Sequence, residues 1–215
     1  MGIRENIADI RAKAGSALIV AVTKNVEAPQ IIEAIEAGIT DIGENRVQEA
    51  KAKFAEIKSR FPNIKWHMIG HLQKNKVKAA LLMFDVIQSV DSFELAEEID
   101  KRTQRIIECF IEVNTSGEES KYGINPNDLF NLLKSISNLK NIKVAGLMTM
   151  EPLTQDKDLI RRSFRKLREL RDRAQSGGFP EVKHLSMGMS DDYPLAIEEG
   201  SDIIRVGRAV FKRKG

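Results

Sequence analysis

Short apolar runs rich in β-branched residues alternate with helical patterns along this chain, and the alternation restricts its fold more than any other feature. Leu18 to Thr23 has the length and composition of a buried strand, and a helical pattern over Ile3 to Ala14 precedes it. Seven further strand patterns cover Ile39 to Ile42, Trp66 to Ile69, Val86 to Val90, Ile107 to Val113, Val144 to Met148, Val182 to Met187 and Ile203 to Val206. Helical patterns lie between them, one of which covers Lys74 to Met83.

Strands that alternate with helices pair in parallel through right-handed crossovers. Eight strand–helix units therefore predict an α/β fold, a single (β/α)8 TIM-type barrel with an extra N-terminal helix. The 215 residues are near the short end for such a barrel, which leaves an open doubly wound sheet as the alternative. No linker rich in proline, glycine or serine divides the chain, so we expect one domain over residues 1–215.

The composition excludes several classes of protein. A net charge of +3 is too small to indicate a nucleic acid or a membrane as partner. The single cysteine, Cys109, excludes an internal disulfide, fits a reducing compartment and lies in an apolar run typical of a buried core. The N-terminus has no apolar signal region, and no window has the roughly 20 apolar residues of a membrane span. We therefore expect a cytoplasmic protein without a membrane segment.

Polar and charged residues follow most of the strand patterns. Ligands of parallel α/β folds bind at the C-terminal ends of the strands, so these residues are expected to meet at one rim. A polar rim with apolar strands behind it is typical of a pocket that binds an anion. The candidates at this rim include Lys24, Asn45, His71, Ser190 and Arg208.

Lys24 directly follows the first strand pattern. Strand alternation places its side chain on the same face as Leu18, Val20 and Val22. A lysine that continues an apolar face can be partly desolvated, which favours the neutral amine. A neutral amine can attack an aldehyde and form a Schiff base. The alternative is an ordinary loop lysine with its ammonium group in water.

Two further features indicate anion binding. Ser190 precedes the last helical pattern, where it is a good N-cap, and a helix N-terminus attracts phosphate. Arg205 lies inside a strand pattern, where its charge needs a partner, and Gly207 lets a ligand approach the backbone closely. The alternatives are a plain helix cap at Ser190 and a buried structural ion pair at Arg205.

The sequence gives no support for nucleotide, metal or nucleic-acid binding. Neither a Gly-x-Gly-x-x-Gly nor a Walker-type motif is present. His67 and His71 are four residues apart but lack a nearby cysteine or acidic ligand pattern, so we expect no metal site. The helical pattern over residues 156–175 is strongly basic, with apolar positions such as Ile160 and Phe164 on one stripe. We expect its arginines to form a solvated face and no nucleic-acid partner.

Eight short stretches run in order over nearly the whole chain and together form a specific combination. They are Val20–Lys24, Gly43–Glu49, Trp66–Lys76, Val113–Asn114, Lys121–Gly123, Gly146–Met150, Leu185–Asp192 and Arg205–Gly207. In this combination the sequence resembles the pyridoxal phosphate homeostasis protein family, relatives of the N-terminal barrel of alanine racemase. The resemblance implies a barrel that binds pyridoxal 5′-phosphate (PLP) at its mouth.

The resemblance also implies roles for single residues. Lys24 matches the lysine that holds the cofactor as a Schiff base. Ser190 and the backbone at Gly207 and Arg208 match the phosphate cradle. Arg205 matches the arginine that faces the pyridine nitrogen in the racemase, where a permanent positive charge disfavours protonation of the ring.

Three positions match less closely or depart from the pattern. Asn45 and His71 match positions at the rim of the site. The residue after Gly207 is usually small and hydroxylated in such proteins, whereas this chain has Arg208. Its charge can pair with phosphate, but with a different side-chain geometry.

The function implied by the resemblance is PLP homeostasis, with binding, buffering and delivery of the cofactor to apo PLP-dependent enzymes. The alternative is a PLP-dependent amino-acid racemase, or a related enzyme, with weak activity. A two-base racemase needs a proton-transfer group on each face of its substrate. Lys24 can serve one face, but the racemase takes its second base, a tyrosine, from an added C-terminal β-domain. This chain ends at Gly215, so we expect a non-catalytic, monomeric carrier, with Tyr122 and Tyr193 as the tyrosines that could reach over the rim.

Overall fold

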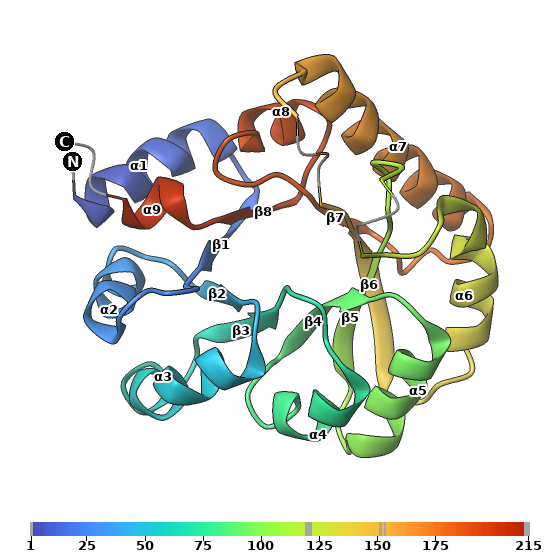
Figure 1. The fold of residues 1–215 in the computed structure, drawn as a ribbon, viewed down its shortest axis with the longest axis horizontal. Coiled ribbons are helices and arrows are strands. Elements are labelled where there is room, and N and C mark those ends of the chain that lie inside the picture. The colour runs from blue at the N-terminus through green and yellow to red at the C-terminus, as the bar shows by residue number, and fades with distance from the viewer. Residues whose placement is uncertain (1, 119–121, 151, 153, 213–215) are drawn as a thin grey trace.

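A computed structural model describes residues 2–118, 122–150, 152 and 154–212. Its eight strands form a closed barrel in sequence order, and every neighbouring pair is parallel. Helices surround the barrel, and the N-terminal helix α1 (Ile3–Ala14) lies beside the last helix, α9 (Arg208–Phe211) (Figure 1). The predicted (β/α)8 barrel with an extra N-terminal helix is confirmed, and the open sheet is excluded.

The strands are short and the helices vary widely in length. The strands are β1 Leu18–Val22, β2 Asp41–Glu44, β3 Lys65–Met68, β4 Val86–Val90, β5 Ile107–Glu112, β6 Ile142–Met148, β7 His184–Ser186 and β8 Ile203–Val206. The remaining helices are α2 Ala28–Glu36, α3 Val47–Arg60, α4 Val77–Ala80, α5 Phe93–Arg102, α6 Leu129–Ile136, α7 Lys157–Ser176 and α8 Tyr193–Glu198.

The helices differ from the sequence-based expectation at two places. The helix predicted over Lys74 to Met83 is a 3-10 turn, Lys74–Lys76, followed by the single turn of α4. It stops early because the chain must turn to bury Phe84, whose ring lies 6.5 Å from that of Trp66. The four-residue α9 was not predicted, since so short a helix has no detectable apolar period.

Two hydrophobic clusters stabilise the barrel. The larger one lies between the strands and the helices, and it includes Cys109, whose complete burial raises the pKa of its thiol and confirms it as a core residue. The smaller cluster fills part of the barrel interior with residues such as Val20, Phe110 and Met148. Val20 pairs in register with Arg205 of β8, which places polar groups beside this inner cluster.

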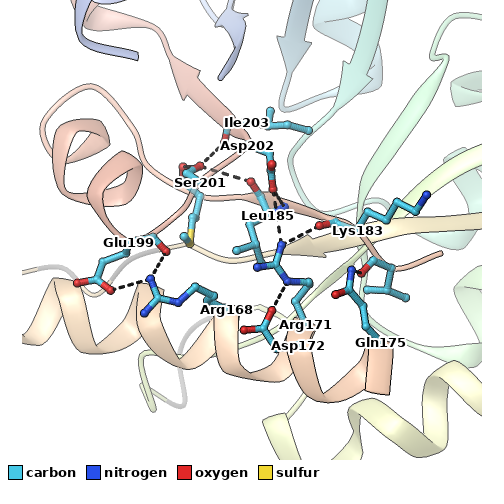
Figure 2. A network of polar contacts seen from close by, with 12 residues as sticks. Arg168, Arg171, Asp172, Gln175, Lys183, Leu185, Glu199, Ser201, Asp202 and Ile203 are labelled. Atoms are coloured by element: carbon cyan, nitrogen blue, oxygen red, sulfur yellow. Dashed lines mark hydrogen bonds and ion pairs between the residues drawn. The ribbon is translucent and has the colours of Figure 1, made fainter. Parts of the chain in front are cut away.

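The basic face of α7 was expected to be solvated. Arg165 is exposed as expected, whereas Arg168 and Arg171 are only partly exposed. Arg165 and Arg168 reach the carboxylate of Glu199, just after α8, at 3.1 and 3.4 Å. Arg168 also donates to the Glu199 carbonyl, and Arg171 donates to the carbonyl of Lys183 (Figure 2). Long arginine side chains from α7 thus fix the segments around β7 and α8. None of the helices in the described ranges combines the length and apolarity that a membrane crossing requires.

Candidate functional site

A cavity of about 870 Å3 opens at the C-terminal ends of the strands. Its lining includes four of the predicted site residues, Lys24, Asn45, His71 and Arg205. A second cavity of about 1010 Å3 adjoins the first, and Arg208 contributes to its wall. The two share Glu112, Tyr122, Met150 and Met189, so they form one continuous hollow over the barrel mouth.

Lys24 stands two residues beyond β1, and it lines the main cavity together with Val22. The predicted alternation along this strand is confirmed, because Val20 faces the barrel interior and Leu18 lines a cavity at the opposite end. Of the two possibilities for Lys24, partial desolvation is contradicted and the exposed loop lysine agrees with the structure, since its side chain is exposed to the open cavity. A ligand in the cavity would have to supply that desolvation itself.

The turn that carries Lys24 is braced from below by a buried ion pair. The Lys53 Nζ atom, on α3, lies 2.7 Å from Glu44 Oε1 at the end of β2. The same ammonium donates to the carbonyl oxygens of Thr23 and Val26 at 2.6 and 3.3 Å. Thr23 also donates through its hydroxyl to Glu44. The strand predicted over Ile39 to Ile42 leaves Glu44 outside, whereas Glu44 ends β2, is wholly buried and supports the Lys24 turn.

Arg205 lies on the floor of the main cavity and is 2% exposed. Its Nη1 atom donates to Ser186 Oγ at 2.7 Å, and its Nη2 atom donates to the Thr149 carbonyl at 2.8 Å. Nη2 also contacts the Met150 sulfur at 3.3 Å. These bonds fix the plane of the guanidinium, which can only donate hydrogen bonds.

Ser190, Gly207 and Arg208 come together, although not as expected. Ser190 does not cap the helix that follows, because the chain first turns through Asp192, whose carboxylate accepts the N–H of Met189. Instead, the Ser190 hydroxyl accepts the backbone N–H groups of Gly207 and Ala209 at 3.3 and 3.1 Å.

The side chain of Arg208 is exposed and forms an ion pair with Asp191. Arg208 therefore points along the wall of the second cavity, where both residues of this pair are found. Neither Ser190 nor Gly207 lines the main cavity. At the predicted phosphate cradle, the backbone N–H groups of Gly207 and Ala209 thus already donate to the Ser190 hydroxyl. The Arg208 guanidinium beside them is paired with Asp191.

Asn45 and His71 occupy the rim on the other side. His71 Nδ1 lies 3.4 Å from Asp91 Oδ2, and its ring stacks on Tyr122 with centroids 4.3 Å apart. A Cβ atom at Gly70 would lie 2.4 Å from the Asn45 carbonyl oxygen, so the chain segments after β2 and β3 can only approach this closely with glycine there.

The two tyrosines differ in position. Tyr122 is 61% exposed and lines both cavities, so it does reach over the rim. Tyr193 is buried in the core cluster, and burial raises the pKa of its hydroxyl. Lys121, next to Tyr122, lies outside the described residues.

Glu112 is a site residue that was not predicted from the sequence. It ends β5, is 5% exposed and lines both cavities. Burial and the nearby charge of Asp91 raise its pKa to about 7, although Arg205 opposes the shift. The signal that could have found it is the one that identified Arg205, a charged residue within an otherwise apolar strand.

This arrangement suits a small anionic ligand that carries a carbonyl group. A primary amine beside an open cavity can form a Schiff base with an aldehyde. A fixed guanidinium donates to an acceptor on the ligand, and hydroxyl and N–H groups can bind its anionic end. Within the described ranges, no group of His, Cys, Asp and Glu side chains could hold a metal ion.

Known proteins share both the sequence and the architecture. The profile of the family described as alanine racemase, N-terminal domain, matches residues 2–214. The pyridoxal phosphate homeostasis protein of Aquifex aeolicus (strain VF5) is 42% identical over 198 residues, which cover 91% of this chain and 86% of that protein. The one from Vibrio alginolyticus is 39% identical over 90% of this chain and 84% of its own length.

Two solved structures extend the comparison. PipY of Synechococcus elongatus PCC7942 with PLP bound has a TM-score of 0.90 and 38% identity, covering 97% of this chain and 99% of PipY. Alanine racemase from Corynebacterium glutamicum has a TM-score of 0.78 at 15% identity, covering 99% of this chain and 61% of the racemase, which is a likeness of fold alone. This chain therefore belongs to the alanine racemase N-terminal domain family, and within that family to the pyridoxal phosphate homeostasis proteins.

Proposed function

We propose that this protein binds PLP through a Schiff base to Lys24 and serves PLP homeostasis by binding, buffering and delivering the cofactor. The observation that carries the proposal is that Lys24 and Arg205, a primary amine and a buried guanidinium, line one cavity at the barrel mouth. The PLP bound to PipY, at 38% identity over almost the whole chain, supports the proposal that this chain binds PLP. We further infer that residues 1–215 act as a single domain.

Each proposed ligand contact follows from the chemistry of the side chain. The Lys24 nitrogen would replace the aldehyde oxygen of PLP, which leaves as water. Arg205 would donate a hydrogen bond to the ring nitrogen, which keeps that nitrogen unprotonated. Ser190, Gly207 and Arg208 would bind the phosphate, with Arg208 exchanging its partner Asp191 for the cofactor.

The rim completes the proposed site. Asn45 and His71 would border the cofactor on the side opposite Ser190. The main cavity is large enough for one small cofactor and remains open to solvent on its outer side. A carrier must release what it binds, and a site open at the rim allows water to reach and hydrolyse the covalent link.

Delivery can be tested by transfer of the cofactor to an enzyme that lacks it. An apo PLP-dependent enzyme is mixed with loaded carrier or with the same amount of free PLP, and the recovery of enzyme activity is followed. A carrier is expected to activate the apo-enzyme fully and to protect the cofactor from an added aldehyde trap. If the loaded protein never activated the apo-enzyme, the delivery role would be wrong.

A racemase activity is the second candidate, because Tyr122 reaches over the rim opposite the wall that carries Lys24. We favour the non-catalytic role, since the relatives that match about 90% of this chain at 39–42% identity are pyridoxal phosphate homeostasis proteins. The expected result is no racemisation of alanine above the rate with free PLP. A rate comparable with that of racemases, lost in Tyr122→Phe, would replace the carrier function with an enzymatic one.

A further inference from the structure

A row of buried polar side chains crosses the barrel interior and ends at Arg205. Its members are Asp41 of β2, His67 of β3, Gln88 of β4, Ser186 of β7 and Arg205 of β8, and none is more than 5% exposed. Strands β4 and β7 are not neighbours in the barrel, so the contact between Gln88 and Ser186 spans its lumen. Buried polar groups carry a large free-energy cost unless each one is paired.

Every consecutive pair in this row is joined by a hydrogen bond. Asp41 Oδ1 lies 2.9 Å from His67 Nε2, and His67 Nδ1 lies 2.9 Å from Gln88 Nε2. Ser186 Oγ lies 2.6 Å from Gln88 Oε1, and 2.7 Å from Arg205 Nη1. The row is therefore one continuous chain of four hydrogen bonds between a carboxylate and a guanidinium.

The chemistry of its members fixes the direction of each bond. Arginine can only donate, so Ser186 Oγ accepts from Arg205 and gives its own proton to Gln88 Oε1. The Gln88 amide then presents its N–H to His67, which makes Nδ1 the acceptor. His67 must consequently carry its proton on Nε2 and donate it to Asp41. All four donors point away from the ligand cavity and toward Asp41.

Asp41 is suited to accept the last hydrogen bond of this chain. Burial alone would raise the pKa of its carboxyl, but hydrogen bonds from His67 and Thr40 outweigh burial and hold the pKa below its usual value. Asp41 and His67 also line a cavity of about 330 Å3 at the N-terminal ends of the strands. Arg205 lines the cavity at the opposite end, so the chain of bonds runs through the barrel from one mouth to the other.

We propose that His67 is a positioning residue for the cofactor site, acting through Gln88 and Ser186 to hold the guanidinium of Arg205. The effect on PLP rests on the proposed function, whereas the hydrogen-bond direction does not. A His67 ring with a proton on Nδ1 would turn the Gln88 amide so that its N–H faced Ser186 Oγ, and the serine would lose the amide oxygen that accepts its own proton. The Arg205 donor directed at the cofactor would lose its fixed orientation.

The direction of the chain can be measured in the protein without any cofactor. Nitrogen-15 NMR of the histidine rings distinguishes the two neutral tautomers from the imidazolium, and His67→Gln assigns the signal. We expect a neutral His67 with a slowly exchanging proton on Nε2 at neutral pH, while the exposed His71 and His184 serve as internal references. A proton on Nδ1, in either the other tautomer or the imidazolium, would overturn the proposal.

The effect on the site is tested with a pair of matched serine variants. Ser186→Ala removes a member of the chain, whereas Ser89→Ala removes an equally buried hydroxyl that makes no hydrogen bond within the described residues. We expect about tenfold weaker PLP binding and an altered pH profile of the visible absorption band in Ser186→Ala. Ser186→Thr, which keeps the hydroxyl, is expected to restore both, and Ser89→Ala to change neither.

Equal behaviour of Ser186→Ala and Ser89→Ala, at equal unfolding midpoints, would contradict the positioning role. If the wild-type protein formed no absorbing adduct with PLP, the proposed function would fail instead. The NMR result on the cofactor-free protein would then still decide whether His67 directs this chain of hydrogen bonds.

Discussion

The mouth of the barrel gathers side chains of both charges, and they differ in how firmly they are held. Arg205 is fixed by contacts with Ser186, Thr149 and Met150, whereas Lys24 is exposed on a braced turn. Glu112 lines the same cavity as both, and its raised pKa of about 7 keeps it protonated up to nearly neutral pH. A carboxyl group with such a pKa can exchange protons at physiological pH.

The raised pKa of Glu112 has a consequence for stability. A carboxyl whose pKa is about 7 when folded, against an ordinary 4.5, binds its proton more tightly in the folded state. Its contribution to stability is complete below pH 4.5 and is lost as the pH rises toward 7. We expect Glu112→Gln to be more stable than the wild type at pH 8, by roughly 1–3 kcal/mol, and equal to it at pH 4.

Denaturant unfolding at the two pH values measures this difference. Asp128→Asn, at an exposed position remote from the cavity, serves as a control for a general charge effect. The account of Glu112 is wrong if its variant shows the same stability difference from the wild type at both pH values.

Single residues of the site differed in how far the sequence revealed them. Lys24 and Arg205 could be identified because each charge stands in or next to an apolar strand pattern. Glu112 is likewise a charged residue in an apolar strand pattern, but the nearest stretch that resembles the family begins after it, at Val113. The true contacts of Ser190 could not be predicted, because they join the loops after β7 and β8, which approach one another only through the pairing of these two strands.

At the scale of elements, the link between α3 and the end of β1 has the most direct bearing on the site. Lys53 on α3 holds two carbonyl groups of the Lys24 turn while it pairs with the wholly buried Glu44. Removing one partner of a buried pair leaves the other charge without compensation, which is costly. This helix therefore controls both the stability of the barrel and the position of Lys24.

Lys53→Met is expected to lower the free energy of unfolding by about 3 kcal/mol and to weaken PLP binding. Adding Glu44→Gln should recover much of the lost stability, since it removes the unpaired charge, but should not recover the binding. Lys51→Met, an exposed lysine on the same helix, is the matched control. Full recovery of PLP binding in the double variant would show that Lys53 does not position the turn.

The elements themselves were predictable where the apolar period extends over several residues. The eight strands and the long helices α1 and α7 follow from their patterns. The shortened α4 and the additional α9 could not be predicted, because their ends depend on tertiary contacts such as the burial of Phe84. The contacts of Arg165 and Arg168 with Glu199 could not be predicted from the sequence, because Glu199 lies more than 30 residues away from both.

At the scale of the whole molecule, ion pairs between the arginines of α7 and Glu199, just after α8, connect two helices on the outside of the barrel. Burial would raise the pKa of Glu199, but hydrogen bonding from Arg165 and the charges of Arg165, Arg168 and Arg161 outweigh it and lower the pKa below its usual 4.5. A lowered pKa means that the carboxylate contributes stability above pH 4.5, which is lost as the pH falls through the folded-state value.

We expect Glu199→Gln to lower the unfolding midpoint at pH 7 and to matter progressively less below pH 4.5. Thermal unfolding followed by circular dichroism measures the difference between variant and wild type across pH. Glu169→Gln, on the same face of the molecule but outside the close ion pairs of Glu199, is the comparison. A difference from the wild type that stayed constant into acid would contradict the role given to the Glu199 charge.

The fold as a whole could be predicted from eight repeated strand–helix units, since few topologies accommodate them. The interior of the barrel could not, because the polar residues that cross it come from five different strands. Their pairing becomes visible only when the barrel is closed. The site therefore has a rim that the sequence predicts and a polar interior beneath it that the sequence pattern does not reveal.

The central claim, that Lys24 holds PLP covalently, is tested most directly by borohydride reduction of the loaded protein followed by intact mass analysis. Lys76→Ala removes another lysine that lines the same cavity and is the matched control. The wild type and Lys76→Ala are expected to gain the mass of one reduced PLP adduct, and Lys24→Ala to gain none. An adduct that persisted at full yield in Lys24→Ala would contradict the assignment of Lys24 as the anchor.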